Sequence, residues 1–106
     1  MAKYLIQAAL TGEGLRGVEK DTAAGRKTAV TKAIEGLGGK VEAFYFALGE
    51  YDVVVVADLP DIIAATAMAM HVNDSGLVRT KTTSLLTVDE VDLAIKKKVA
   101  YRAPGK

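Results

Sequence analysis

The sequence predicts an α+β fold of the ferredoxin-like kind, a four-stranded antiparallel sheet with two helices on one face and an extra C-terminal helix. Strand-like and helix-like segments follow one another in the order β-α-β-β-α-β, which is the split βαβ arrangement. The run Val53–Val56 is apolar on both faces of a strand, so each face needs a covering layer. With 106 residues there is room for one core, and we expect one domain over 1–100 and a loose tail over 101–106.

The first third of the chain predicts one strand and one long helix. Residues 4–10 form a short apolar run, as in a central strand. Apolar residues then recur with a helical period over 15–37, with Arg26 on the opposite, charged side. We expect a joint in this helix, with Asp21 capping its second segment. Gly38-Gly39 ends the helix, because glycine adopts the left-handed conformation of a C-terminal cap.

The middle of the chain predicts a β-hairpin. Gly49-Glu50 suits a two-residue type II′ turn, which favours glycine at its first central position. This turn pairs Phe46 with Val53 on one face and leaves Tyr45 and Val54 on the other. The register therefore decides which apolar set faces the helices.

The last third predicts a helix, a strand and a second helix. Pro60 suits the first position of a helix that runs to about residue 72 and carries hardly any charge, so we expect it to be covered on most sides. Residues 77–86 alternate as a threonine-rich strand. Residues 87–90 match a capping box that opens a final helix to about residue 99.

Composition narrows the classes of function. A net charge of +1 gives no electrostatic footprint for nucleic acid or an anionic membrane. One histidine and no cysteine argue against a tetrahedral zinc site, and no cofactor is expected. No segment matches a secretory signal or a membrane span, so we expect a cytoplasmic protein.

The doubly apolar strands predict self-association. The helices cover only one face of the sheet. The uncovered face then carries one of two mostly apolar sets, either Phe44, Phe46 and Val53 or Tyr45, Val54 and Val56. Burying such a face contributes about 10 kcal/mol before entropy, comparable to the stability of a whole small domain. The sequence therefore predicts a homodimer, or a higher homo-oligomer, formed through the open sheet faces.

Several short motifs resemble those of one family. The stretch Gly49-x-Tyr51-Asp52, followed by a valine run and Leu59-Pro60-Asp61, is similar to the motif for which the GYD family is named. Gly38-Gly39-Lys40, Phe44-Tyr45 and 76–80 extend the similarity over nearly the whole chain. The resemblance implies a small, mostly bacterial domain of unknown function with the architecture of the dimeric α+β barrels. That group also includes cofactor-free monooxygenases, haem-degrading enzymes and amino-acid-sensing domains.

Tyr51 and Asp52 are the first candidate site residues. As a functional pair, they would act as hydrogen-bond donor and base on a small carbonyl ligand. In the alternative, Asp52 satisfies exposed backbone N–H groups beside the hairpin and Tyr51 covers the sheet edge. The hairpin register places the two side chains on opposite faces, which favours the structural alternative.

A second group of candidates is polar and spread over three strands. Arg79 and its neighbour Lys81, with Gln7 and Tyr45, would orient a carboxylate or phenolate in a cleft between sheet and helices. In the alternative, the two cations decorate an edge strand and discourage unwanted pairing.

The second helix contributes the remaining candidates. His71 lies where some haem-degrading relatives of the fold place an axial ligand, or its cationic form simply suits a helix C-terminus. Met68 and Met70, set among alanines, would line a flexible ligand pocket or pack closely on a neighbour.

Three functions are compatible with these patterns. The first is an oligomeric module that binds a small organic ligand. The second is a cofactor-free monooxygenase or isomerase of the dimeric α+β barrel type, which rests on fold analogy. The third is a purely structural, self-assembling component.

Overall fold

The computed structural model describes every residue from Met1 to Lys106. In chain order its elements are β1 (Ala2–Leu10), α1 (Gly12–Asp21), α2 (Ala23–Gly36), β2 (Lys40–Phe46), β3 (Val53–Leu59), α3 (Ile62–Asp74), β4 (Val78–Leu85) and α4 (Val88–Lys96).

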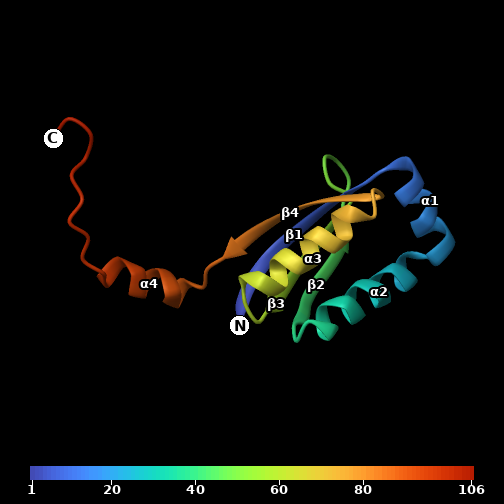
Figure 1. Ribbon diagram of the computed structural model, residues 1–106, viewed down its shortest axis with the longest axis horizontal. Helices are drawn as coiled ribbons and strands as arrows, with labels where there is room; N and C mark the ends of the chain where they lie inside the picture. The colour runs from blue at the N-terminus through green and yellow to red at the C-terminus, as the bar shows by residue number, and fades with distance from the viewer.

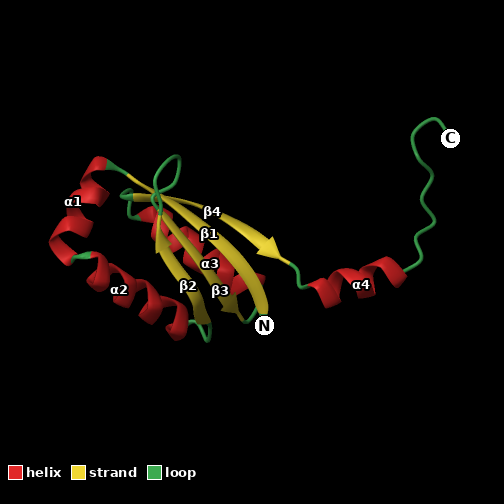
Figure 2. Ribbon diagram, turned by 180° about the vertical axis from the view of Figure 1, so that it is seen from behind, coloured by secondary structure: helices red, strands yellow, loops and turns green.

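The four strands form one antiparallel sheet in the order β2-β3-β1-β4, which is the ferredoxin-like order and confirms the predicted fold class. α2 packs against β2, and α3 packs over β4 and β3 on the same side of the sheet (Figure 1). Seen from behind, the strands lie in front with no helix over them (Figure 2). The sheet therefore has one covered face and one open face.

The hydrophobic core lies between the covered face and the two helices. β3 contributes alternate residues to it, and its burial pattern is strictly two-periodic. The buried cluster consists of Tyr4, Ile6, Ile34, Val53, Val55, Ala57, Leu59 and Ala65. The other side of β3, with Val54 and Val56, belongs to the open face, so the structure decides between the two predicted sets.

The first helical segment departs from the prediction at both its start and its joint. α1 begins at Gly12, since the Thr11 hydroxyl accepts a hydrogen bond from the N–H of Gly14 at 3.0 Å. The cap of α2 is Thr22, not Asp21, because its hydroxyl accepts from the N–H of Gly25 at 3.1 Å. Thr22 has φ 71° and ψ 160°, a conformation that non-glycine residues rarely adopt, so the chain turns sharply between two separate helices.

The hairpin register agrees with the prediction, since Phe46 pairs with Val53 and Tyr45 with Val54. The regular ladder ends at Phe46 and Val53. Just beyond it, the N–H of Ala47 donates one further hydrogen bond of 2.8 Å to the carbonyl of Asp52. The predicted two-residue turn is wrong, because no hydrogen bond joins Leu48 and Tyr51 and residues 47–52 form a longer loop. Gly49 has φ 123° in this loop, a value that favours glycine.

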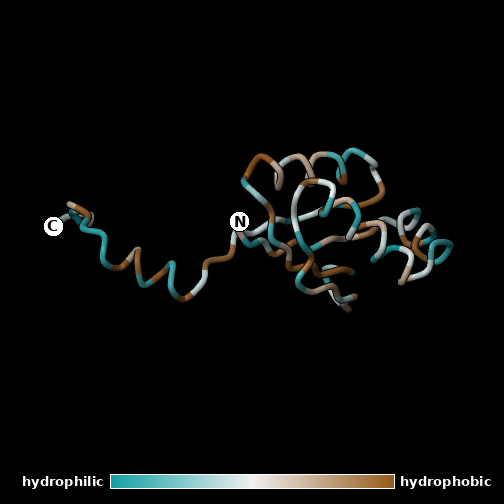
Figure 3. The backbone as a smooth tube through the Cα atoms, turned by 90° about the horizontal axis from the view of Figure 1, so that it is seen from below, coloured by the Kyte–Doolittle hydropathy of each residue, from teal (hydrophilic) through white to brown (hydrophobic).

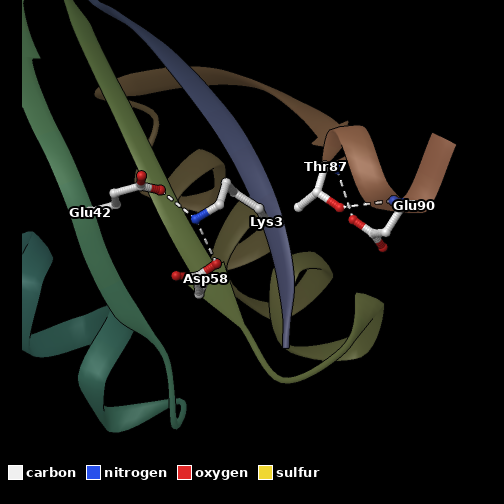
Figure 4. A network of polar contacts seen from close by, with 5 residues as sticks. All are labelled: Lys3, Glu42, Asp58, Thr87 and Glu90. Carbon is white, nitrogen blue, oxygen red and sulfur yellow. Dashed lines mark hydrogen bonds and ion pairs between the residues drawn. The ribbon is translucent and has the colours of Figure 1, made fainter. Parts of the chain in front are cut away.

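The last two helices have well-defined starts. α3 begins at Ile62 rather than at Pro60, because Asp61 caps it: its carboxylate accepts from the N–H of Ala64 at 2.8 Å. α4 opens with the predicted capping box between Thr87 and Glu90, with bonds of 2.8 and 3.1 Å (Figure 4). The backbone N–H of Thr87 is the main cause that lowers the pKa of Glu90 below its ordinary value.

α4 lies apart from the rest of the chain, and it ends at Lys96 rather than near residue 99 (Figure 1). Along its tube, hydrophobic and hydrophilic stretches alternate (Figure 3). Its large apolar residues are exposed, and so are Ile62 and Met70 on α3, so within one chain α3 is covered only toward the sheet. None of the helices combines the length and apolar character needed to cross a bilayer.

Replacing Gly39 with alanine should destabilise the fold. A Cβ atom at Gly39 would lie 2.4 Å from the carbonyl oxygen of Asp58 and 2.8 Å from Cδ2 of Leu59. We expect Gly39→Ala to lower the free energy of unfolding by about 2 kcal/mol, measured by urea denaturation. The control is Gly36→Ala in the last turn of α2, where a Cβ meets nothing within 4 Å. That change should raise the stability by up to about 0.5 kcal/mol, and equal effects of both changes would contradict this view of the packing.

Candidate ligand-binding groove

An apolar groove lies between α2 and α3, above the covered face of the sheet. The two helices make little contact with each other, so the sheet between them is not fully covered. The open space has a volume of about 60 Å³, and ten of its thirteen lining residues are hydrophobic. The lining residues are Ile6, Ala8, Leu10, Arg26, Val30, Phe44, Val53, Met68, Ala69, Val72, Val78, Thr80 and Thr82.

The chain builds this groove from small and flexible side chains. Ala8 and Thr80 are direct partners across β1 and β4, and their short side chains leave space at the floor of the groove. Ala69 keeps the wall on the α3 side thin, and Met68 beside it has an adaptable side chain. Of the two methionines considered from the sequence, Met68 lines the groove and Met70 is exposed.

Asn73 fixes one end of the groove, a role that the sequence analysis missed. Its amide donates hydrogen bonds to the Thr80 hydroxyl at 2.7 Å and to the carbonyl of Ala69 at 2.6 Å. Its carbonyl oxygen accepts from the N–H of Thr80 at 3.0 Å. The two bonds to Thr80 join the end of α3 to β4, and the bond to Ala69 stays within α3, so Asn73 fixes where α3 ends above the sheet. An asparagine shortly before a turn is the only signal in the sequence for this role.

Arg26 is the only charged residue in the lining. It was expected on the solvent side of one long helix, and that expectation is wrong, because Arg26 and Val30 are four residues apart and lie together on the side of α2 that faces the groove. A second cavity of about 190 Å³ adjoins the groove and shares Leu10, Arg26 and Val78 with it. Arg26 therefore stands where the apolar groove meets a wider, more polar opening.

None of the polar candidates from the sequence lines the groove, namely Gln7, Tyr45, Tyr51, Asp52, His71, Arg79 and Lys81. Gln7 and Tyr45 both oppose Val54 in the sheet, and Gln7 also opposes Lys81, so these side chains share the open face. Arg79 lies on that face too, opposite Ala9. The predicted cleft between sheet and helices therefore does not contain them, because strand alternation turns them away from the helices.

Asp52 connects the hairpin to β1. Its carboxylate accepts from the N–H of Leu10 at 2.7 Å, and its own N–H donates to the carbonyl of Ala8 at 2.8 Å. Tyr51 beside it is half-buried. These bonds favour the structural role that was the alternative for this pair, since the carboxylate is occupied by a backbone group.

His71 lies exposed in the last turn of α3, away from the groove lining. No group of three or more histidine, aspartate or glutamate side chains is arranged to hold a metal ion. The position of His71 at a helix C-terminus is the one in which a cationic imidazole is favoured.

The open face combines an apolar middle with an ionic network at one end. Lys3 donates to Glu42 and, at 2.9 Å, to Asp58 (Figure 4). The bond to Glu42, and next the bond to Asp58, raises the pKa of Lys3 above its usual value. The middle of the face carries half-buried, mostly apolar residues: Leu5, Gln7, Ala9, Ala43, Val54 and Val56.

Comparison with known proteins identifies one family. The family model described as GYD domain matches residues 4–95, nearly the whole chain. No curated protein and no solved structure matches the chain.

Removing the Asp52 carboxylate should weaken the fold rather than a binding function. Asp52→Ala leaves the N–H of Leu10 without its partner, so we expect a loss of about 1–2 kcal/mol in the free energy of unfolding. Hydrogen exchange at the Leu10 amide should become faster in the same variant. The exposed neighbour Glu50→Ala serves as control and should change stability by less than about 0.5 kcal/mol. An unchanged stability of Asp52→Ala would remove the structural role.

Proposed function

Because the chain belongs to the GYD domain family and carries an apolar groove beside its sheet, we propose that it is an oligomeric module that binds a small organic ligand in this groove. The observation that carries the proposal is the lining, in which ten of thirteen residues are hydrophobic and the polar ones lie on β4 and at Arg26. Binding sites for small molecules typically combine an apolar wall with few polar groups.

The groove supports binding more than catalysis. Apart from Arg26, no residue of the lining has a titratable side chain, so the groove contains no carboxylate, imidazole or amine that could act as general acid or base. Tyr45, Tyr51 and Asp52 would have to reach the cavity for a monooxygenase or isomerase, and none of them lines it. The enzymatic alternative therefore rests on fold analogy alone.

The proposed oligomer is a homodimer in which two open faces pack together. The apolar middle of this face is only half-buried within one chain, and contact with a second copy would cover it. We also propose a cytoplasmic location, which the absence of cysteine supports.

A titration with 1-octanol tests the groove. We expect this alcohol to shift the methyl signals of Ile6, Val53 and Met68 in NMR spectra, because these residues line the cavity. Thr82→Phe places a ring on the covered face and should weaken octanol binding about tenfold or more, or by about 1.4 kcal/mol. Thr83→Phe, on the open face of the same strand, should leave octanol binding unchanged and alter only self-association.

Either of two results would overturn the proposal. One is an absence of groove shifts up to the solubility limit of the alcohol. The other is equal binding by the two phenylalanine variants, which would place the alcohol outside the groove.

A second candidate function is self-assembly, and α4 is the observation that favours it. Val88, Val91 and Ile95 lie on one side of α4 at helical spacing, and no part of the same chain covers them. We propose that a second copy of the chain covers this side. α4 follows β4 after Leu86 and Thr87, so it begins at the border of the open face and extends beyond its own subunit (Figure 2).

The size of the helix agrees with a reciprocal contact. A nine-residue helix is about 14 Å long, too short to bury alone the ~800 Å² per partner of a standard interface. In a two-fold pair each copy contributes one α4 and one docking surface, which doubles the contact. The open sheet faces would add to this contact.

Two glutamate variants of α4 test this contact. Ile95 is 74% exposed and Leu93 is 63% exposed in the single chain, but Leu93 lies on the opposite side of the helix. We expect Ile95→Glu to shift the protein toward smaller species in native mass spectrometry and Leu93→Glu to leave the distribution unchanged. If both variants behave like the parent, or if the parent is a monomer, the self-assembly role is wrong.

A further inference from the structure

Arg26 lies in the linings of both the apolar groove and the wider cavity beside it. Its side chain is 35% exposed, so the guanidinium is partly withdrawn from water without being buried. Leu10 and Val78 line both spaces as well, and they make the passage between them apolar. A molecule that fills the groove and extends outward would therefore pass Arg26.

The hydrogen-bonding capacity of Arg26 is unused. A guanidinium has five N–H donors, and none of them donates a hydrogen bond within the chain. Its only ionic neighbour is Asp21, with 3.8 Å between Nη1 of Arg26 and Oδ2 of Asp21. That separation exceeds hydrogen-bond length, so the pair interacts by charge while the donors stay free.

The dimensions and charges restrict the kind of molecule that fits. The groove has only about 60 Å³ of space, about the liquid volume of two water molecules, so it suits a short alkyl segment rather than a ring. The neighbouring cavity has about 190 Å³ for the rest of the molecule. Asp21 stands in the lining of this second cavity and would repel a doubly charged phosphate more than a singly charged carboxylate. The planar guanidinium matches a carboxylate in a bidentate geometry.

We infer that the ligand of this groove is an amphipathic monocarboxylic acid, with its apolar part between α2 and α3 and its carboxylate bound by Arg26. This inference rests on the proposed ligand-binding function and adds the chemical class of the ligand. The side-chain hydroxyl of Thr82, which lines the groove on β4, makes no hydrogen bond within the chain, so it is one further polar group available to the bound molecule.

The test compares octanoate with 1-octanol at pH 7, two probes of equal chain length that differ in charge. Isothermal titration calorimetry should give octanoate at least about tenfold tighter binding, since a charge-assisted bond adds to the same apolar contact. Arg26→Gln should reduce this preference to near unity while octanol binding is retained. Lys27→Gln removes an equal charge from an exposed neighbour outside the lining and should preserve the preference.

A third variant tests the repulsion between Asp21 and the bound carboxylate. Asp21→Asn removes the competing carboxylate, so octanoate should bind several-fold more tightly and octanol should bind as before. If Arg26→Gln fails to fold, Arg26→Lys takes its place, because it retains the charge and loses the planar fork. It should then bind octanoate more weakly than the parent and octanol equally well.

The outcomes separate the two proposals. Equal affinity of the parent for both probes, or an octanoate preference in Arg26→Gln (or in Arg26→Lys, where it takes its place) as large as in the parent, overturns the carboxylate assignment and leaves the groove as a binding site. Failure of the parent to bind either probe overturns the binding function itself.

Discussion

Burial of one side of β3 is the interaction on which the rest of the structure depends. Val53, Val55, Ala57 and Leu59 lie beneath the helices, and Ile34 of α2 is fully buried in the same cluster. Each large aliphatic side chain in such a place contributes about 1.5–3 kcal/mol. Since β3 is a central strand, its position determines where β1 and β2 pair and which of their residues face the helices.

The spacing of the two helices produces the site. α2 packs toward β2 and α3 toward β4, so the middle of the covered face is left with small side chains and an open groove. Asn73 holds the end of α3 to β4, while Arg26 lies on the same side of α2 as Val30 and so reaches the groove. A bound molecule would thus contact parts of the chain that are far apart in sequence.

The open face and α4 are the two apolar surfaces that a single chain leaves uncovered. They are adjacent, because β4 borders the open face and leads into α4 (Figure 2). The ionic network of Lys3, Glu42 and Asp58 lies at one end of the open face, where it limits the apolar area. The proposed ligand groove and the proposed assembly surface therefore lie on opposite sides of the sheet, so each can be altered without the other.

The sequence by itself determined the order of the elements, the hairpin register and the capping box of α4, because these depend on local periodicity and on turn and cap residues. It also predicted two apolar faces on β3, but only the tertiary structure decided that Val53 and Val55 face the helices. The site could not be read from the sequence, since its lining joins residues of α2, α3 and all four strands, which lie far apart along the chain. Local patterns thus determine elements, while packing between distant elements determines which side chains meet.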